Sequence, residues 1–335
     1  REKSIKYRWN MNIIVIIIIT ILILTNAITD APNAIATLVG TKVMEFKKAA
    51  KLSAIFNLIG IIAMSFINFS VANCISSMVN INDGVNGYIV LISAMMSVIL
   101  FALIALHFGI PTSETHALIA GLTGATIAIY GVKGVNFGEW INIIIGLLWS
   151  IIGTIVITKI LRKCINQLSN QKVKSAQILS SCGLSFMHGA QDGQKFIGIL
   201  IIFTCLLNKT QIPNSANPLN YILIIIYTAT IMAIGVSIGG KKIVQNIGTD
   251  MVVLNMQEGL LSDVTTIFTL FIASITGLPV STTHAKTVSI IGVGKCNGSK
   301  FNTKKVLDIC KAWIFTFPVC GLLSYVLAYF IGEFF

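Results

Sequence analysis

Two stretches of this 335-residue sequence carry the same polar pattern at the same spacing. They are 110–116, which reads IPTSETH, and 278–284, which reads LPVSTTH. Proline removes a backbone donor and breaks a helix, and the Ser and Thr residues that follow are good caps for a new helix. A helix start attracts an anion through its free amides and its dipole. The candidate anion-binding hydroxyls are therefore Thr112, Ser113, Thr115, Ser281, Thr282 and Thr283.

An acidic element also occurs twice. Asp30 lies in 30–33, DAPN, and Asp192 lies 162 residues later in 187–195, MHGAQDGQK. The two proline stretches are 168 residues apart, so both pairs share nearly one offset, which indicates an internal duplication. The glycines on either side of Asp192 predict close backbone approach and local unwinding.

Charged side chains at membrane depth each cost at least about 2.5–3.5 kcal/mol on insertion scales, so they mark functional sites. We interpret Asp30 and Asp192 as carboxylates that hold a cation. Lys195 is predicted to lie near a small oxyanion bound between the two proline stretches. His188, close to Asp192, is a candidate proton relay.

Other polar groups leave two interpretations open. Glu258, Asp263 and Lys286 fit either a functional cluster or side chains that snorkel to the membrane surface. His116 and His284 are expected to cap a helix or to bond a backbone carbonyl. The hydroxyl groups also fit a purely structural polar seam between helices, although the duplication favours a binding site.

The composition places these residues in a membrane. Hydrophobic residues make up 55%, charged residues 11%, and the mean hydropathy is +0.86, whereas a soluble domain carries about 25% charged residues. These values exclude a disordered chain, a nucleic-acid-binding domain and an ordinary cytosolic enzyme. The net charge of +12 is therefore interpreted as an orientation signal. Seven scattered cysteines without metal-site spacing are interpreted as small buried hydrophobes.

Apolar runs of roughly 20 residues predict membrane spans; they occur near 11–29, 52–72, 139–161, 179–206, 219–238 and 306–332. Two further apolar regions, 88–131 and 259–294, are interrupted by the proline stretches. Backbone freed at membrane depth is tolerated only inside protein or beside a wet cavity, so each region predicts a helical hairpin with a polar tip. The predicted fold is an all-α polytopic membrane protein with about ten membrane helices or half-helices.

Four basic clusters orient the spans when all of them are placed in the cytoplasm; they lie at 42–51, 162–174, 241–242 and 295–311. The two hairpins then enter from opposite faces, an inverted-topology repeat that is typical of secondary transporters. The predicted organisation is a first repeat at 1–161, a basic cytoplasmic linker at 162–177 and a second repeat at 178–335, in the cytoplasmic membrane. The basic N-terminus at 1–8 lies outside in this scheme, against the charge rule.

These motifs resemble those of the inorganic phosphate transporter (PiT) family of secondary carriers. The two proline stretches are similar to the P-T-S-x-S-H and P-V-S-T-T-H hairpins of that family, and 26–37 and 185–195 look like its two signatures. The likeness covers nearly the whole chain. It implies symport of inorganic phosphate with Na⁺ or H⁺ by alternating access, in a homodimer, with no enzymatic activity and no other cofactor.

Carried over by position, the resemblance adds Gln194 and Lys195 to the anion-binding hydroxyls. The residues that it implies for the coupling cation are Asp30, Asn33, Asp192, Gln191 and Thr29. Thr29 and Gln191 depart from the family pattern and affect the choice of cation. Glu114 replaces a small residue in the first tip, where a carboxylate repels an anion unless it is protonated or faces away.

Three alternatives remain. A sulfate permease shares this fold, but phosphate is favoured because it can donate a hydrogen bond to a buried carboxylate and sulfate cannot. A membrane-embedded enzyme is disfavoured, because the four histidines show no metal-binding pair and no nucleophile–base set is evident. A channel is disfavoured because an inverted duplication with carboxylates in both halves favours a carrier.

Overall fold

The computed structural model describes residues 2–81, 84–165, 170–299 and 302–334. These ranges are helical apart from short connections and a single β-bridge between Val79 and Val135. The helices are α1 (Glu2–Asp30), α2 (Pro32–Gly40), α3 (Phe46–Ile67), α4 (Ser70–Ser77), α5 (Val85–Phe108), α6 (Glu114–Tyr130), α7 (Phe137–Leu148), α8 (Thr154–Ile165), α9 (Asn170–Asn208), α10 (Ile222–Ile238), α11 (Lys241–Gln245), α12 (Met256–Thr276), α13 (Thr282–Asn297) and α14 (Thr303–Phe334).

The helical architecture confirms the predicted fold class. Eight helical segments of the described residues are long and apolar enough to cross a membrane, and the shorter helices α6 and α13 follow the two proline stretches. Large apolar side chains such as Ile314 and Leu223 face outward, whereas carboxylates, lysines and hydroxyls are buried inside. This distribution is expected when lipid, not water, surrounds the helices.

The breaks in the helices follow from local sequence. Pro32 begins α2 directly after Asp30 and Ala31. Gly109 and Gly277 end α5 and α12 in the left-handed region, with φ of 67° and 75°, a conformation that glycine adopts without steric cost. The hydroxyl caps are confirmed: Ser113 accepts from the amide of His116 at 3.3 Å, and Ser281 accepts from that of His284 at 3.2 Å.

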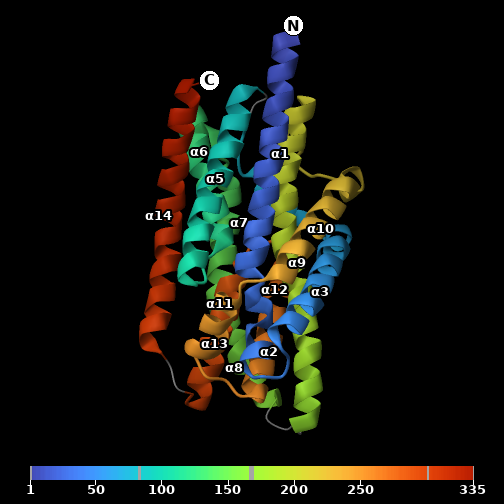
Figure 1. Cartoon of the computed structure of the whole chain (residues 1–335), viewed down its shortest axis with the longest axis vertical. Helices are drawn as coiled ribbons and strands as arrows, with labels where there is room; N and C mark the ends of the chain where they lie inside the picture. The colour runs from blue at the N-terminus through green and yellow to red at the C-terminus, as the bar shows by residue number, and fades with distance from the viewer. Residues whose placement is uncertain (1, 82–83, 166–169, 300–301, 335) are drawn as a thin grey trace.

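The two hairpins meet near the middle of the molecule. Figure 1 shows both termini at the same end, with α1 running away from that end and α14 running back to it. From the level where their tips meet, α5 and α6 extend toward this end and α13 extends toward the other (Figure 1). The 39-residue helix α9 packs against α3, α4 and α12. Residues from distant parts of the sequence therefore converge at one depth.

Helix covers most of the predicted linker at 162–177, because α8 continues to Ile165 and α9 begins at Asn170. The side chains of the basic N-terminal residues lie outside the described part of the chain, so their placement stays a prediction.

The glycines beside Asp192 allow close helix packing, and α9 is not unwound there. A Cβ on Gly189 would lie 2.2 Å from the carbonyl oxygen of Asn57, and one on Gly60 would lie 2.0 Å from that of Phe186. Small residues let membrane helices approach closely, so α3 and α9 pack backbone to backbone. The predicted close approach is thus confirmed, and the predicted unwinding is wrong.

We expect Gly189→Ala to destabilise the fold by about 1–3 kcal/mol, the usual cost of overpacking. Thermal unfolding of the purified protein in detergent measures this effect. Gly292→Ala is the matched control, because a Cβ there would lie at an ordinary 3.5 Å from Thr158. Equal stability of the two variants would contradict the close packing of α3 on α9.

Candidate functional site

The tips of the two hairpins touch each other directly. The hydroxyl of Ser113, in front of α6, donates to the hydroxyl of Ser281, in front of α13, at 2.9 Å. Both side chains are buried, and Thr112 is buried beside Ser113. Two helix starts, each with its positive dipole end, therefore point at one region. The middle of α9 and the break between α1 and α2 complete this region, which we call the central cluster.

Asp30 ends α1 and is only 3% exposed. One carboxylate oxygen accepts from Asn33 and from Thr283, and the other accepts from Thr282 at 3.0 Å. Asn33 also donates to the hydroxyl of Thr283 at 3.0 Å. The first half of the chain is thus joined to the second hairpin tip through an aspartate.

Asp192, on α9, lies on the other side of Thr282. Its Oδ1 accepts from Lys195 Nζ at 2.6 Å, and its Oδ2 lies 3.1 Å from His188 Nε2 and 3.3 Å from the Thr282 hydroxyl. Asn57 contacts the other ring nitrogen of His188 at 3.0 Å. The hydroxyl of Thr282 therefore bridges the two aspartates, and His188 is fixed between Asp192 and α3.

Lys195 ties α9 to both hairpin tips. Its ammonium group donates to Asp192, to the Thr115 hydroxyl at 2.6 Å and to the carbonyl of Val280 at 2.7 Å. Thr115 in turn donates to the same carbonyl at 3.1 Å. All three ammonium hydrogens are used, and the side chain is only 3% exposed. The sequence prediction of a lysine at the meeting point of the tips thus agrees with this geometry.

A cation could be held beside these groups. Ligand atoms of Asp30, His188 and Asp192 all lie within 4.8 Å of one another, and all three side chains are buried. Carboxylate oxygens suit hard cations, and an imidazole nitrogen can join them. Glu114, at the start of α6, adds a third buried carboxylate and accepts from Thr29 at 3.2 Å. Its closeness to the cluster is a feature that the sequence left undecided.

Two predicted residues do not join the central cluster. Gln191 donates to the Ser274 hydroxyl at 2.9 Å, at the end of α12. Gln194 donates to the carbonyl of Asn68 at 2.7 Å and accepts from the amide of Ala72 at 3.3 Å. Asp192 lies one residue from Gln191, about 100° around the helix, so the two side chains point to different neighbours. In this structure the glutamines anchor the segment around α4 and the end of α12.

The histidines of the tips make ring contacts. The rings of His116 and His284 are 4.5 Å apart in an edge-to-face arrangement. His116 lies 4.7 Å from Phe317, and His284 lies 3.9 Å from Trp313, both on α14. We call these four rings the ring stack. Both ring nitrogens of His284 and Nδ1 of His116 lack a hydrogen-bond partner among the described residues, so these three atoms do not bond a backbone carbonyl there.

A second buried ion pair lies one helical turn beyond the central cluster. Lys286, on α13, donates to Asp263, on α12, at 2.5 Å and to Thr37 and Ser262 at 3.1 and 3.2 Å. Ser180 donates to Asp263 at 3.2 Å. Lys286 is 1% exposed and Asp263 is fully buried, so these charges do not snorkel. The sequence left this choice open because it does not show which helices meet.

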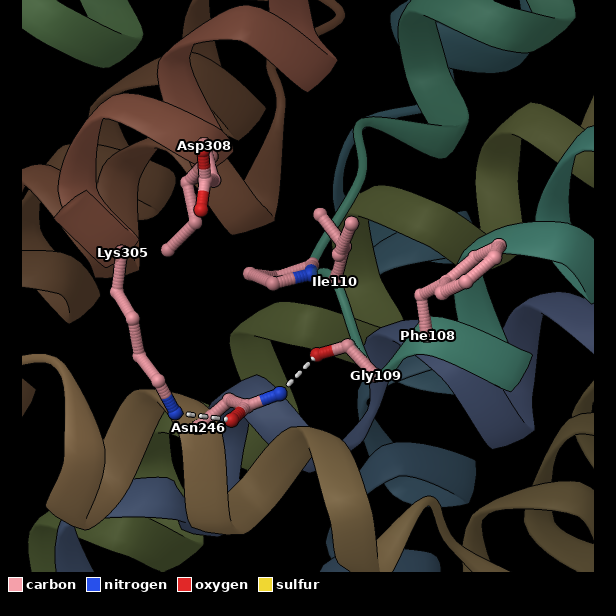
Figure 2. Close-up of a pocket in the computed structure, with 8 residues that line it drawn as sticks. Phe108, Gly109, Ile110, Asn246, Lys305 and Asp308 are labelled. Carbon is pink, nitrogen blue, oxygen red and sulfur yellow. Dashed lines mark hydrogen bonds between the residues drawn. The ribbon is translucent and has the colours of Figure 1, made fainter.

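A cavity of about 270 Å³ lies against the connection between α5 and α6. Figure 2 shows Asn246 donating to the carbonyl of Gly109, at 2.5 Å, and accepting from Lys305, at 2.7 Å. Lys305 also pairs with Asp250 at 2.6 Å. The cavity also borders Pro111, two residues before the Ser113 tip. A water-accessible space thus lies close behind the first hairpin tip.

Comparisons with known proteins agree with this architecture. A family model described as the phosphate transporter family matches residues 26–176 and 165–324. A probable low-affinity inorganic phosphate transporter of Bacillus subtilis is 32% identical over 333 residues, 96% of this chain and 97% of that protein. Its counterpart in Rhizobium meliloti is 30% identical over 92% of each chain. A solved structure titled "The sodium-dependent phosphate transporter" superposes with a TM-score of 0.85 at 21% identity, covering 97% of this chain and 100% of that one.

Proposed function

Because this chain belongs to the phosphate transporter family, we propose that it moves inorganic phosphate across the membrane together with Na⁺. It is a multi-pass membrane protein and a transporter, not an enzyme. We further propose that the protein is a symporter of the cytoplasmic membrane and that it works by alternating access. The observation that carries it is the meeting of two helix starts at Lys195 and two aspartates.

The two helix starts and Lys195 supply the chemistry that an oxyanion requires. Free amides, hydroxyls and an ammonium group all donate hydrogen bonds, and two positive dipole ends add to the attraction. We propose that phosphate binds between Ser113 and Ser281 and takes over donors that now bond within the protein. Lys195 would exchange Asp192 or Val280 for a phosphate oxygen. The hydroxyls that we assign to phosphate are Ser113, Thr115, Ser281, Thr282 and Thr283, with Thr112 next to them.

Charge balance supports a coupled cation. Among the described residues, the central cluster contains three buried carboxylates and one ammonium group, that of Lys195. The carboxylates belong to Asp30, Glu114 and Asp192. Phosphate would add further negative charge to a region from which water is excluded. Uncompensated buried charge is strongly unfavourable, so phosphate must enter with cations. We assign a Na⁺ to the oxygens of Asp30 and Asp192, with Asn33 and Thr29 as supporting residues.

Sodium is favoured over the proton by two observations. The structure that this fold superposes on is titled as sodium-dependent, and the ligand atoms around Asp30 and Asp192 are mostly oxygens. Phosphate is favoured over sulfate by the family and by the buried carboxylates, which accept a hydrogen bond that only phosphate can donate at neutral pH. His188 would then orient Asp192 and need not relay a proton.

We also propose that the chain is arranged as two inverted repeats. The contact between Ser113 and Ser281, from motifs 168 residues apart, supports two inverted repeats at 1–161 and 178–335. The basic clusters support placing the end opposite to the termini in the cytoplasm. We also propose a homodimer, for which the family resemblance is the sole support.

Uptake of ³²P-labelled phosphate into proteoliposomes tests the function. We expect an inward Na⁺ gradient to drive accumulation, and a pH gradient in choline buffer to drive little. Unlabelled phosphate should compete fully, whereas sulfate should compete weakly. Accumulation that depends on the pH gradient and not on Na⁺ would contradict the proposed coupling. Stronger competition by sulfate than by unlabelled phosphate would reassign the substrate.

A further inference from the structure

An apolar groove lies between α8 and α13, far from the central cluster. The two helices pack against each other at the end of the molecule opposite to the termini (Figure 1). The cavity between them measures about 570 Å³, within the usual range of ligand pockets, about 300–1,000 Å³. Val156 and Ile160, on α8, are exposed beside it, so the groove opens toward lipid.

One wall of the groove is a face of α13. Val288, Ile291, Gly292 and Lys295 line the cavity, and their spacing of three and four residues puts them on the same side of the helix. Gly292 leaves room there, because a Cβ on it would lie 3.5 Å from its nearest neighbour, Thr158 of α8. This wall is therefore apolar up to Gly292 and basic at Lys295, in the last turn of the helix.

The opposite wall has the same polarity. Ile151 precedes α8 and Ile155 lies on it, whereas Lys159 follows Ile155 by about one helical turn. The hydroxyl of Thr158 adds no free donor, because it donates to the carbonyl of Thr154 at 2.8 Å. The two lysines therefore mark one end of the groove, and its apolar part extends from them by about 10–12 Å along the helices.

The two lysines lack an anionic partner in the part of the chain that the structure describes. Lys159 and Lys295 are exposed, and neither belongs to an ion pair of those residues. No carboxylate of the described ranges lines the cavity. Like charges that share one space repel each other, so an anion at this end of the groove is favourable.

We propose that the groove binds an anionic phospholipid of the cytoplasmic leaflet. The headgroup phosphate lies between Lys159 and Lys295, and an acyl chain covers the apolar walls. Basic pockets between membrane helices on the cytoplasmic side suit such headgroups. A free phosphate ion leaves the apolar walls uncovered, and a zwitterionic lipid brings its own cation to the lysines. Charge and polarity together therefore select an anionic lipid, at a site independent of the transported ion.

Native mass spectrometry of the purified full-length protein tests this site. Phosphatidylglycerol and phosphatidylcholine with the same acyl chains are titrated at equal concentrations. We expect the wild type to bind phosphatidylglycerol at least about tenfold more tightly, and the double variant Lys159→Gln, Lys295→Gln to lose this preference. The matched control is Lys47→Gln, Lys51→Gln, which removes the same charge from exposed positions on α3 and should keep the preference.

Gly292→Leu tests the apolar part of the groove while both lysines stay in place. We expect it to weaken the binding of phosphatidylglycerol, and thermal unfolding shows whether the variant is folded; if it is not, the lysine variants decide. An unchanged preference in the double lysine variant, or unchanged binding in folded G292L, overturns the site. Displacement of the lipid by inorganic phosphate at the same concentration overturns it too. A smaller share of dimer in the double lysine variant, with lipid binding unchanged, would instead assign the groove to a second copy of this chain.

Discussion

Replacing Lys195 with methionine is expected to lower Na⁺-driven phosphate uptake by at least about 100-fold. Removing one partner of a buried ion pair costs about 3–5 kcal/mol, and each 1.4 kcal/mol is about a factor of ten in an equilibrium. Lys195 donates to Asp192, Thr115 and Val280, so its loss removes both an anion ligand and the link between α9 and the hairpin tips. Initial rates of ³²P uptake, normalised to the amount of reconstituted protein, measure the effect.

Loss of folding must be separated from loss of binding in this experiment. Asp192 keeps a buried charge in the single variant, whereas the double variant Asp192→Asn, Lys195→Met does not. We expect the double variant to recover a monodisperse, cooperatively unfolding protein but not phosphate uptake. Lys133→Met, at an exposed position, should behave as the wild type. Substantial uptake by a folded K195M protein would remove Lys195 from the phosphate site.

Replacing Lys286 with methionine is expected to lower the free energy of unfolding by about 3–5 kcal/mol. The ammonium group bonds Asp263 at 2.5 Å in a region with almost no exposed surface, so the single variant leaves the negative charge of Asp263 without a compensating cation in the interior. The double variant Asp263→Leu, Lys286→Met should recover most of the loss, because well-packed apolar residues often replace a buried pair at little cost. Thermal unfolding in detergent gives both values.

Lys305→Met is the control for this pair. Lys305 bonds Asp250 at a similar 2.6 Å, but its side chain is 34% exposed, and exposed pairs contribute about 0–1 kcal/mol. We therefore expect a small change in unfolding temperature for K305M and a large one for K286M. Similar losses in the two variants, or no recovery in the double variant, would show that burial does not determine the contribution of the pair.

Much of the fold could be predicted because lipid imposes simple rules. Length and hydropathy determine the spans, and proline followed by hydroxyl residues determines the two hairpin tips. The motifs did not predict the contacts of Asp30 with Thr282 and Thr283, but they placed Lys195 near the tips, where it donates to Thr115 and to Val280. Local chemistry was sufficient here because cap, break and charge all lie within a few residues of one another.

The remaining features depend on which helix faces which. Gln191 and Gln194 share a motif with Asp192 but face α12 and the α4 region, and an offset of one or two residues on a helix is enough to change the neighbour. The pairing of Lys286 with Asp263 depends on the docking of α13 against α12. The contact of Glu114 with Thr29 is likewise visible only when the side chains of α1 are in place. Motif reasoning identifies residues, whereas helix packing determines their partners.

The ring stack has a mechanical consequence. His116 moves with the first hairpin tip and His284 with the second, and the two rings contact each other and the same helix, α14. A tip that swings away must slide its ring across the other ring or shift α14, which packs closely on α6. The positions of the two tips are thus coupled through contacts between rigid aromatic rings. In the proposed alternating-access cycle, these contacts would resist displacement of one tip while the other stays in place, and this resistance would oppose a continuous leak from one side of the membrane to the other.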